Sequence, residues 1–522
     1  MQLVLPNIPY AALSLAVLFI GALIIYAFKD RLDKSVGKIA VGFSGLAALL
    51  MAYPFYQVVT GAVEEYTEYA TWSGLLEQFG LKLDGIAFPI TFAVVVLGFL
   101  SVVYAVGYTD HSENKGTFFA NQLFFLMGMQ WVTLATNLVE FFIAWELMLV
   151  PSYFLILFWG LPETRKRTAM KFWLYTQSGA VCILVGFGIL YSLTGSFDLA
   201  LLQTGLNGLD LSSIWPGLGI SVGTLLKIVF ILLAAGFLVK MAVFPIHWWL
   251  PPVHAEAPTP ISVLLSGAMI ETGAYALVRF GSITLWDAAY YLSIFVAALG
   301  VITMFYGGFM ALAQVDIKRL LAYSSVSQMG YILFSLGLYS PMGFEGGMFH
   351  LINHAFSKGL LFMTAGAVIH QTGLRDITKM GGLSNKMPIT AFAAAIGMMS
   401  IAGSPPLSGF ASEWMMFLGG FQRAFWPVSN ITFLIISILA VSSSILSAGY
   451  MLRFFWKVFL GPHPDELEDV KESSNSMTIP MIILGILIVI FGIFPGLALD
   501  VIVPAVTDLI PWDLIPGLIP LP

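Results

Sequence analysis

The sequence has few charged residues, a single cysteine and no nucleotide-binding glycine pattern. Charged residues make up 10% of the 522 residues, whereas soluble domains carry about 25%. One cysteine, Cys182, supports no disulfide, no Cys-rich zinc site and no iron–sulfur cluster. Because the sequence contains neither a Rossmann glycine fingerprint nor a phosphate loop, we expect no nucleotide site and no redox centre in this chain.

Hydrophobic residues, in contrast, make up 58% of the chain and form recurrent apolar runs of about twenty residues. This pattern predicts an all-α polytopic membrane protein with about fourteen transmembrane helices. The hydrophobic N-terminus reads as a first span rather than as a cleaved signal. The predicted spans cover residues 8–28, 39–60, 86–108, 117–136, 137–159, 168–194, 222–246, 261–281, 286–311, 317–340, 346–372, 389–421 (interrupted), 429–458 and 477–497.

The placement of basic residues predicts the orientation of these spans. Most of the 23 Lys and Arg residues fall in the odd-numbered connections, whereas the long even-numbered connections 61–85 and 195–221 are acidic or neutral. Because basic loops stay on the cytoplasmic side, we expect the odd connections inside and the N-terminus outside. The predicted location is the cell membrane of a bacterium or archaeon.

Two pairs of similar segments indicate an internal repeat. GAYALVRF (273–280) resembles AGYMLRFF (448–455), and spans 7 and 12 are both interrupted by proline-rich breaks, at 244–260 and 402–414. Equivalent features five spans apart predict two five-helix units of opposite orientation, spans 4–8 and 9–13, as in many transporters. The predicted domains are an N-terminal three-helix segment (1–116), the first unit (117–281), the second unit (286–461), and a C-terminal helix and tail (462–522).

Ionisable residues inside apolar spans are the candidate functional residues, because a charge at the bilayer centre costs roughly 2.5–3.5 kcal/mol on insertion scales. Glu146 lies near the middle of span 5, and Lys240 lies where span 7 meets its prolines. Burial lowers the pKa of a lysine, and a nearby carboxylate raises it again. Such a pair can therefore switch between charged and neutral states. The alternatives are a structural carboxyl for Glu146 and a snorkelling lysine for Lys240.

Spans 8 and 11 add four candidates. Glu271 falls at the middle of span 8 with no basic residue within one turn, so its partner must lie on another helix. His350, His354 and Lys358 are spaced i, i+4, i+8 and share one face of span 11. Histidine titrates near neutral pH and suits proton transfer. The alternatives are a packed histidine at position 350, a metal site with only two ligands, and a bis-histidine haem without an attachment motif.

Three further residues complete the candidate set. Glu413 follows the second break, in a place that parallels that of Lys240 in the first unit. Glu140 lies nearer the outer end of span 5 and is otherwise an interfacial residue. Lys227 lies about a turn inside the outer end of span 7, where snorkelling is the alternative.

Several of these stretches resemble the antiporter-like membrane subunits of respiratory complex I. FLVKMAVFPIHWWLPPVHAEAPTPISVLLSG (237–267) carries the resemblance, together with LLAYSSVSQMGYI (320–332), HLINHAFSKGLLF (350–362), DITKMGGL (376–383) and SPPLSGFASEW (404–414). Quinone-linked and F420H2-linked relatives, membrane-bound hydrogenases and multisubunit Na⁺/H⁺ antiporters share these motifs. The chain length is similar to that of the M-type subunit (chain 4).

The resemblance implies a fourteen-helix proton-translocating subunit without a cofactor of its own. Glu146 would pair with Lys240, a residue on span 8 would lie in mid-channel, His354 and Lys358 would connect the half-channels, and Glu413 would be the exit carboxylate. The implied partners are other antiporter-like membrane chains (N- and L-type) and a peripheral redox arm. Flavin, iron–sulfur clusters and a quinone-type acceptor would belong to those partners.

The sequence departs from the family pattern at two positions. Glu271 stands where many members carry a lysine, and Gln328 stands where some M-type chains have a histidine. We expect Lys358 to supply the missing positive charge. The favoured hypothesis is a subunit of a redox-driven proton pump. The alternatives are a Na⁺/H⁺ antiporter or membrane-bound hydrogenase subunit, and a purely structural membrane scaffold.

Overall fold

The computed structural model describes residues 8–509 except 33–34, 72–77, 111–112, 216–218 and 426–428. Residues 1–7 and 510–522, which belong to the predicted N-terminal and C-terminal segments, lie outside the described residues. In the described part, ten helices are long and apolar enough to cross a membrane. They are Tyr10–Ala27 (α1), Val36–Val59 (α3), Phe88–Tyr108 (α4), Leu138–Trp159 (α6), Arg165–Thr194 (α7), Val222–Met241 (α9), Thr259–Thr284, Ser293–Ala313 (α14), Ile431–Phe459 (α19) and Asn475–Ile493 (α20).

Further helices fill the interior and the ends of this bundle. Lys115–Leu134 (α5), Ile317–Gly337 (α15), Pro341–Thr372 (α16), Pro388–Ile401 (α17) and Ser408–Phe425 (α18) coincide with predicted spans. Short helices are Lys29–Leu32 (α2), Leu199–Asn207 (α8), Leu250–Glu256 (α10), Trp286–Tyr291 (α13) and Gly496–Leu509 (α21). The prediction placed only an unstructured tail after span 14, so α21 is an element that it missed.

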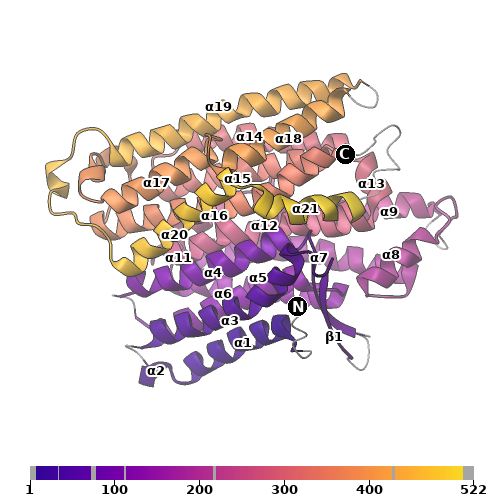
Figure 1. The fold of residues 1–522 in the computed structure, drawn as a ribbon, viewed down its shortest axis with the longest axis horizontal. Coiled ribbons are helices and arrows are strands. Elements are labelled where there is room, and N and C mark those ends of the chain that lie inside the picture. The colour runs from indigo at the N-terminus through magenta and orange to yellow at the C-terminus, as the bar shows by residue number, and fades with distance from the viewer. Residues whose placement is uncertain are drawn as a thin grey trace.

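The long helices lie side by side, with α1 and α3 at one edge and α19 at the opposite edge (Figure 1). Helices α15 and α16 lie between these edges, and nearly all of their residues are buried. The eighth predicted span, Thr259–Thr284, is buried along its most apolar stretch. The polar residues of these central helices are therefore shielded from lipid, as polar groups inside a membrane must be.

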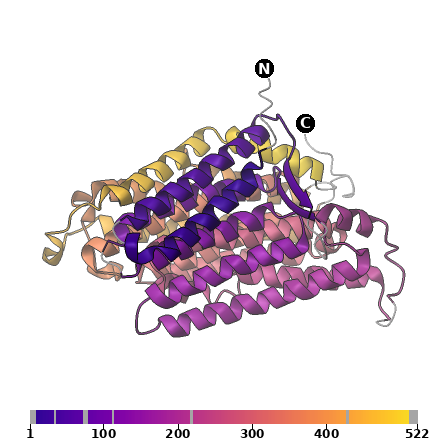
Figure 2. The same ribbon diagram turned by 90° about the horizontal axis from the view of Figure 1, so that it is seen from below.

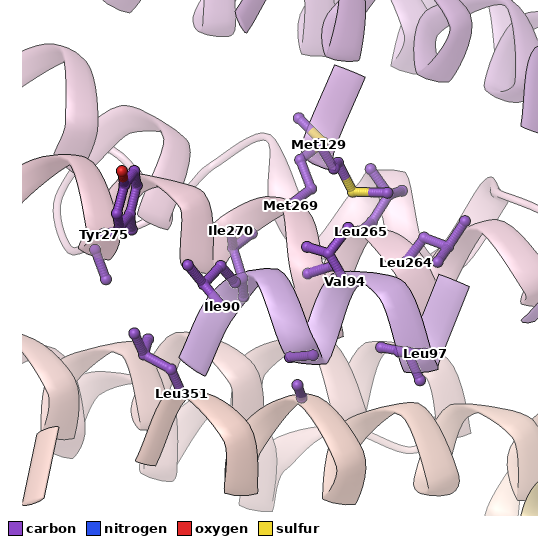
Figure 3. Close-up of a cluster of buried hydrophobic side chains, with 14 of the residues drawn as sticks. Ile90, Val94, Leu97, Met129, Leu264, Leu265, Met269, Ile270, Tyr275 and Leu351 are labelled. Atoms are coloured by element: carbon purple, nitrogen blue, oxygen red, sulfur yellow. The ribbon is translucent and has the colours of Figure 1, made fainter. Parts of the chain in front are cut away.

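The eighth span is not a uniform α-helix. It starts as Thr259–Leu264 (α11), passes through a π-helical turn at Leu265–Met269 (η1), continues as Ile270–Ala276 (α12) and ends in a second π-helical stretch, Leu277–Thr284 (η2). Figure 3 shows Ile90, Val94 and Leu97 of α4 packed beside Leu265 and Ile270 of this span. π-Helical turns occur often at functional sites, and here they flank the segment that carries Glu271.

A β-hairpin, which the all-α prediction missed, lies in the connection after α3. Strands Tyr66–Thr71 (β1) and Gln78–Leu83 (β2) pair antiparallel, with Tyr66 opposite Leu83. The Glu68 carboxylate accepts from the backbone N–H groups of Ala11 and Ala12 at 2.7 and 2.9 Å. The hairpin thus satisfies free N–H groups at the start of α1, and it lies at the end of the bundle where α1 begins and α21 ends (Figure 2).

Both proline-rich segments interrupt a helix, as predicted. Helix α9 ends at Met241, five residues before the predicted end of span 7, and the chain resumes as α10 at Leu250. The first break is therefore residues 242–249. Helix α17 ends at Ile401 and α18 begins at Ser408, so the second break is residues 402–407. Each break contains one cis X-Pro peptide, at Pro245 and at Pro406.

Candidate functional site

The central contact of the site joins Glu271 to His354. His354 Nδ1 lies 2.7 Å from Glu271 Oε1, and both side chains are fully buried. The contact links α12 of the eighth span to α16. The prediction that the partner of Glu271 lies on another helix is therefore correct. The sequence did not say which residue this partner is, and in the structure it is His354.

A glycine allows the two helices to come close enough for this contact. A Cβ atom on Gly267 would lie 2.8 Å from the carbonyl oxygen of Ala355, so a larger residue would push the eighth span away from α16. Gly267 precedes Glu271 by one turn, and Ala355 follows His354 directly. Small residues commonly permit such close packing of membrane helices. Gly267 therefore permits the helix spacing at which Glu271 and His354 come into contact.

Lys358 points toward a different helix from the one that His354 contacts. Its Nζ atom donates to the hydroxyl of Ser324 on α15, and that hydroxyl in turn donates to the carbonyl of Leu321 at 2.8 Å. No ion pair of Lys358 is found among the described residues. Lys358 is fully buried beside the His354 region, but it does not neutralise Glu271 by direct contact.

His350 connects the central pair to the second break. Its Nδ1 atom lies 2.9 Å from Ser412 Oγ on α18, and its Nε2 atom lies 2.8 Å from Gln328 Oε1 on α15. The rings of His350 and His354 stack with their centroids 6.3 Å apart. His350 is thus packed and hydrogen-bonded, as one alternative held, and it also lies between His354 and α18.

Hydroxyl groups around Asn353 form a polar cluster at the second break that the sequence analysis missed. Asn353 Oδ1 accepts from Ser357, Ser400 and Ser408 at 3.2, 2.9 and 2.6 Å. The Asn353 amide also lies 3.4 Å from His350 Nδ1. Asn353 stands inside the HLINHAFSK motif and Ser408 inside SPPLSG, so their polar character within apolar spans was the available signal.

Glu413 lies in the second turn of α18, against the loop of the second break. Gly403, whose φ is +64°, has no side chain there, and a Cβ atom on it would lie 2.6 Å from Glu413 Oε2. Glu413 is 4% exposed. Lys240 comes before its break and Glu413 comes after its own, so the two positions are not equivalent residue by residue.

Lys240 and Glu146 are neighbours at the first break but do not touch. Lys240 lies in the last turn of α9, and its Nζ atom is 4.7 Å from the centre of the Trp145 ring on α6. No ion pair between Lys240 and Glu146 is found within the described ranges. An aromatic face attracts a cation, so Trp145 contacts the ammonium directly, while Glu146 interacts with Lys240 electrostatically over a longer distance.

Glu140 and Lys227 lie away from this line of residues. Glu140 accepts from Trp131 Nε1 at 2.7 Å and from the Gly80 N–H at 3.3 Å, so it ties α6 to α5 and β2. It is buried within the protein, in the first turn of α6. The Lys227 ammonium lies 3.8 Å from the centre of the Tyr291 ring. Neither residue contacts another candidate among the described residues.

Five of the candidate residues share one chemical property. Glu146 Oε1, Lys240 Nζ, Glu271 Oε2, His354 Nε2 and Glu413 Oε1 are buried polar atoms without a hydrogen-bond partner in the described part of the chain. Buried polar groups are almost always hydrogen-bonded, so such atoms mark places where water or a mobile proton can bind. No group of three or more His, Cys, Asp and Glu side chains suited to a metal occurs in the described ranges.

A multi-helix bundle with two interrupted helices and a buried row of ionisable residues defines an ion-translocating type of membrane protein. Comparison with known families makes this class specific. The family model described as NADH:quinone oxidoreductase/Mrp antiporter, TM, matches residues 135–442, more than half of the chain. The chain belongs to this family, as the resemblance in its motifs indicated.

Two curated relatives and one solved structure illustrate the relationship. F420H2 dehydrogenase subunit M of Methanosarcina mazei is 30% identical over 95% of this chain and 97% of its own length. A Na⁺/H⁺ antiporter subunit of Alkalihalophilus pseudofirmus is 35% identical over 88% of this chain, which spans only 58% of that relative. A chain of the membrane-bound sulfane sulfur reductase, an archaeal respiratory membrane complex, is 28% identical with a TM-score of 0.81, covering 93% of this chain and 76% of that one. These relatives are subunits of larger membrane complexes of bacteria and archaea.

Proposed function

We propose that the chain is a proton-translocating, antiporter-like subunit of a redox-driven complex of the NADH–quinone or F420H2 dehydrogenase type. The observation that carries the proposal is a set of buried ionisable residues: Lys240, the Glu271–His354 contact and Glu413. Each of these residues keeps a polar atom without a hydrogen-bond partner among the described residues. Isolated ionisable groups are costly inside a membrane and usually serve function.

Each residue has a specific role in this proposal. Electron transfer in partner subunits changes the charge next to Glu146, and Lys240 moves between Glu146 and the Trp145 ring. A proton then passes between Glu271 and His354, because carboxylate and imidazole groups within hydrogen-bond reach exchange protons directly. Lys358, which is hydrogen-bonded to Ser324, takes part through a conformational change that brings it to His354. His350 and Ser412 lead from His354 toward Glu413, which releases the proton.

The proposed architecture has fourteen spans with both termini outside. It adds α5, α15, α16 and the α17–α18 pair to the ten apolar helices. Residues 117–281 and 286–461 are the two inverted units, preceded by the three-helix segment 1–116 and followed by residues 462–522. The proposed partners are N- and L-type antiporter-like chains and a peripheral redox arm. The flavin, the iron–sulfur clusters and the quinone-type acceptor lie in the partner subunits.

Proton pumping by the reconstituted complex tests this proposal. Lys240→Ala and Glu146→Gln should each abolish the electron donor-dependent pH gradient while the complex stays assembled. Lys457→Ala, which removes an exposed lysine at the end of α19, is the matched control and should pump like the wild type. Full retention of the pH gradient in both site variants would refute the proposal.

A second candidate function is a multisubunit Na⁺/H⁺ antiporter, which the identity to the antiporter chain of Alkalihalophilus pseudofirmus favours. A membrane-bound hydrogenase is the related redox alternative. Mass spectrometry of the purified complex separates these functions, since flavin-binding and cluster-bearing subunits accompany a redox-driven pump and are absent from an antiporter. Sodium-driven pH changes in vesicles without an electron donor would favour the antiporter.

A further inference from the structure

A line of charged and polar side chains leads from the hairpin surface to the span that carries Glu271. We call Glu65, Lys82, Asp84, Arg279 and Tyr275 the hairpin network. Lys82 on β2 pairs with Glu65 and lies 3.6 Å from Asp84 Oδ2. The Arg279 guanidinium binds Asp84 through two bonds, NH1 to Oδ2 at 2.8 Å and NH2 to Oδ1 at 2.7 Å. Tyr275 OH accepts from Arg279 Nε at 3.2 Å.

Exposure decreases from the Glu65 end of this line toward Tyr275, although the Arg279 side chain, at 11%, is more exposed than that of Asp84. The Glu65 side chain is 47% exposed and that of Lys82 is 27% exposed, whereas Asp84 retains 5% and Tyr275 1%. Glu271, Tyr275 and Arg279 follow one another at intervals of four residues, which places them along one side of the eighth span. The hairpin network therefore extends from the hairpin face of the protein to Tyr275, four residues after Glu271 on the same span.

The Asp84–Arg279 pair differs chemically from the proposed translocation residues because both of its carboxylate oxygens accept hydrogen bonds. Asp84 Oδ1 accepts from Arg279 and from the N–H groups of Ile86 and Ala87 at 3.2 and 2.9 Å, and Oδ2 accepts from Arg279. A carboxylate with this many donors has little capacity left for a transferable proton. Glu271 Oε2, in contrast, has no partner in the described part of the chain.

The second unit lacks the corresponding pair. Arg453 is the arginine of the similar segment AGYMLRFF, where it follows Tyr450 by three residues, whereas Arg279 follows Tyr275 by four. The Arg453 guanidinium donates to the backbone carbonyl of Gln314 at 2.5 Å. No ion pair of Arg453 occurs among the described residues. A carboxylate partner therefore distinguishes Arg279 from Arg453. The Asp84–Arg279 pair lies between the hairpin face and the part of the eighth span that carries Glu271.

We propose that the Asp84–Arg279 pair is a seal that closes the hairpin-side route to Glu271, so that protons at Glu271 leave through His354. The inference rests on the proposed function, because a seal has a role only where protons move. A bidentate arginine–carboxylate pair suits this role, since it fixes two planar groups against each other and holds both carboxylate oxygens in charge-assisted hydrogen bonds. Asp84 and Arg279 are thus positioning residues that set the direction of transfer.

Passive proton leak in vesicles that contain the whole complex tests the seal. Asp84→Asn keeps the oxygen that accepts from Ile86 and Ala87 but removes the charge. We expect Asp84→Asn, Arg279→Gln and the double variant each to accelerate the decay of an imposed pH gradient severalfold and to lower the protons pumped per electron pair. Arg375→Gln, which breaks the partly exposed Asp316–Arg375 pair elsewhere, should leave the leak unchanged.

A second substitution shows whether the leak uses the proposed route. Adding Glu271→Gln to Asp84→Asn should restore a tight membrane, and persistence of the leak in that variant would refute the seal. Tight vesicles from the variant that combines Asp84→Asn with Arg279→Gln would also refute the seal. A leak in Arg279→Gln but not in Asp84→Asn would refute it as well. If the seal is wrong but the proposed function right, Lys240→Ala still abolishes pumping. If the function is wrong, Lys240→Ala pumps normally.

Discussion

The two helix breaks have similar proline-rich sequences but are surrounded by different kinds of side chain. Around the first break, Lys240 lies over Trp145, and the indole of Trp249 donates to the Val239 carbonyl at 2.8 Å. Around the second break, hydroxyl groups and the amide of Asn353 form the contacts. The first break is lined by aromatic rings and the second by serine side chains.

The difference follows from the charge that each break holds. An ammonium group has donors but no acceptors, and an aromatic face attracts it without offering a site that would trap its proton. Near a carboxylate, hydroxyl groups both donate and accept, so they relay protons and reorient readily. The comparison teaches that one break suits holding a cation and the other suits passing protons toward an acid.

The largest expected effect on proton pumping comes from disrupting the contact between Glu271 and His354. His354→Gln keeps a donor near Glu271 but cannot take up a proton and pass it on. We expect stability close to that of the wild type and proton pumping reduced at least about a hundredfold, the usual contribution of an acid–base group. Donor-dependent acidification in reconstituted vesicles measures this effect.

His354→Leu provides the matched comparison. It leaves the buried Glu271 carboxyl without its partner, which costs about 1–3 kcal/mol of stability. Both variants should fail to pump, but only His354→Leu should unfold at a lower temperature. Normal pumping by His354→Gln would show that protons do not have to pass through His354.

The sequence contained enough information to predict the apolar spans, both breaks and the isolated charges, because each is a local property of the chain. It could not identify His354 rather than Lys358 as the partner of Glu271. The face shared by His354 and Lys358 is predictable from spacing, but the rotation of the eighth span depends on its π-helical turns and on the close approach at Gly267. These are tertiary effects.

The hairpin and the Trp145 contact were missed for different reasons. Strands Tyr66–Thr71 and Gln78–Leu83 lie in a connection that we treated only as a loop, although tyrosine, threonine and phenylalanine favour strands. The position of Lys240 above Trp145 depends on how α9 packs on α6. Aromatic residues are common in apolar spans, so the tryptophan next to Glu146 did not by itself indicate a contact with Lys240.

A medium effect on stability is expected from the Asp84–Arg279 pair at the hairpin. Arg453, in the similar segment of the proposed second unit, has no such carboxylate partner among the described residues. Burial would raise the pKa of Asp84, but the Arg279 guanidinium and the Lys82 ammonium hold it at about 2, below its ordinary value of 3.8. Because the folded-state pKa is depressed, the stabilisation is present above about pH 4 and is lost as the pH falls toward 2. The difference is worth about 2 kcal/mol.

Thermal unfolding of the detergent-solubilised wild type and Asp84→Asn at pH 6, 4, 3 and 2 measures this term. The two proteins should converge in stability as the pH falls through that window. Arg453→Gln in the second unit removes no carboxylate pair, so its difference from the wild type should not depend on pH there. A constant gap between wild type and Asp84→Asn would contradict the assigned role of Arg279.

A smaller effect is expected from the backbone of the second break. Gly403 has φ +64°, and a Cβ atom on it would meet the Glu413 carboxylate at 2.6 Å. In Gly403→Ala, the left-handed conformation alone costs roughly 1–2 kcal/mol, and Glu413 must also move. We therefore expect a lower unfolding temperature together with reduced pumping. Unchanged pumping would show that the position of Glu413 against the break is not needed.

The smallest effect concerns the first break and has the opposite sign. Ala242 follows α9 with φ +55°, so the first break already contains an alanine in the conformation that favours glycine. Ala242→Gly removes about 1 kcal/mol of strain, while the greater freedom of glycine in the unfolded chain offsets roughly half of that gain. We expect stability to rise by about 0.5 kcal/mol with Lys240 undisturbed and pumping unchanged. A loss of pumping in Ala242→Gly would instead show that the strained turn holds Lys240 above Trp145.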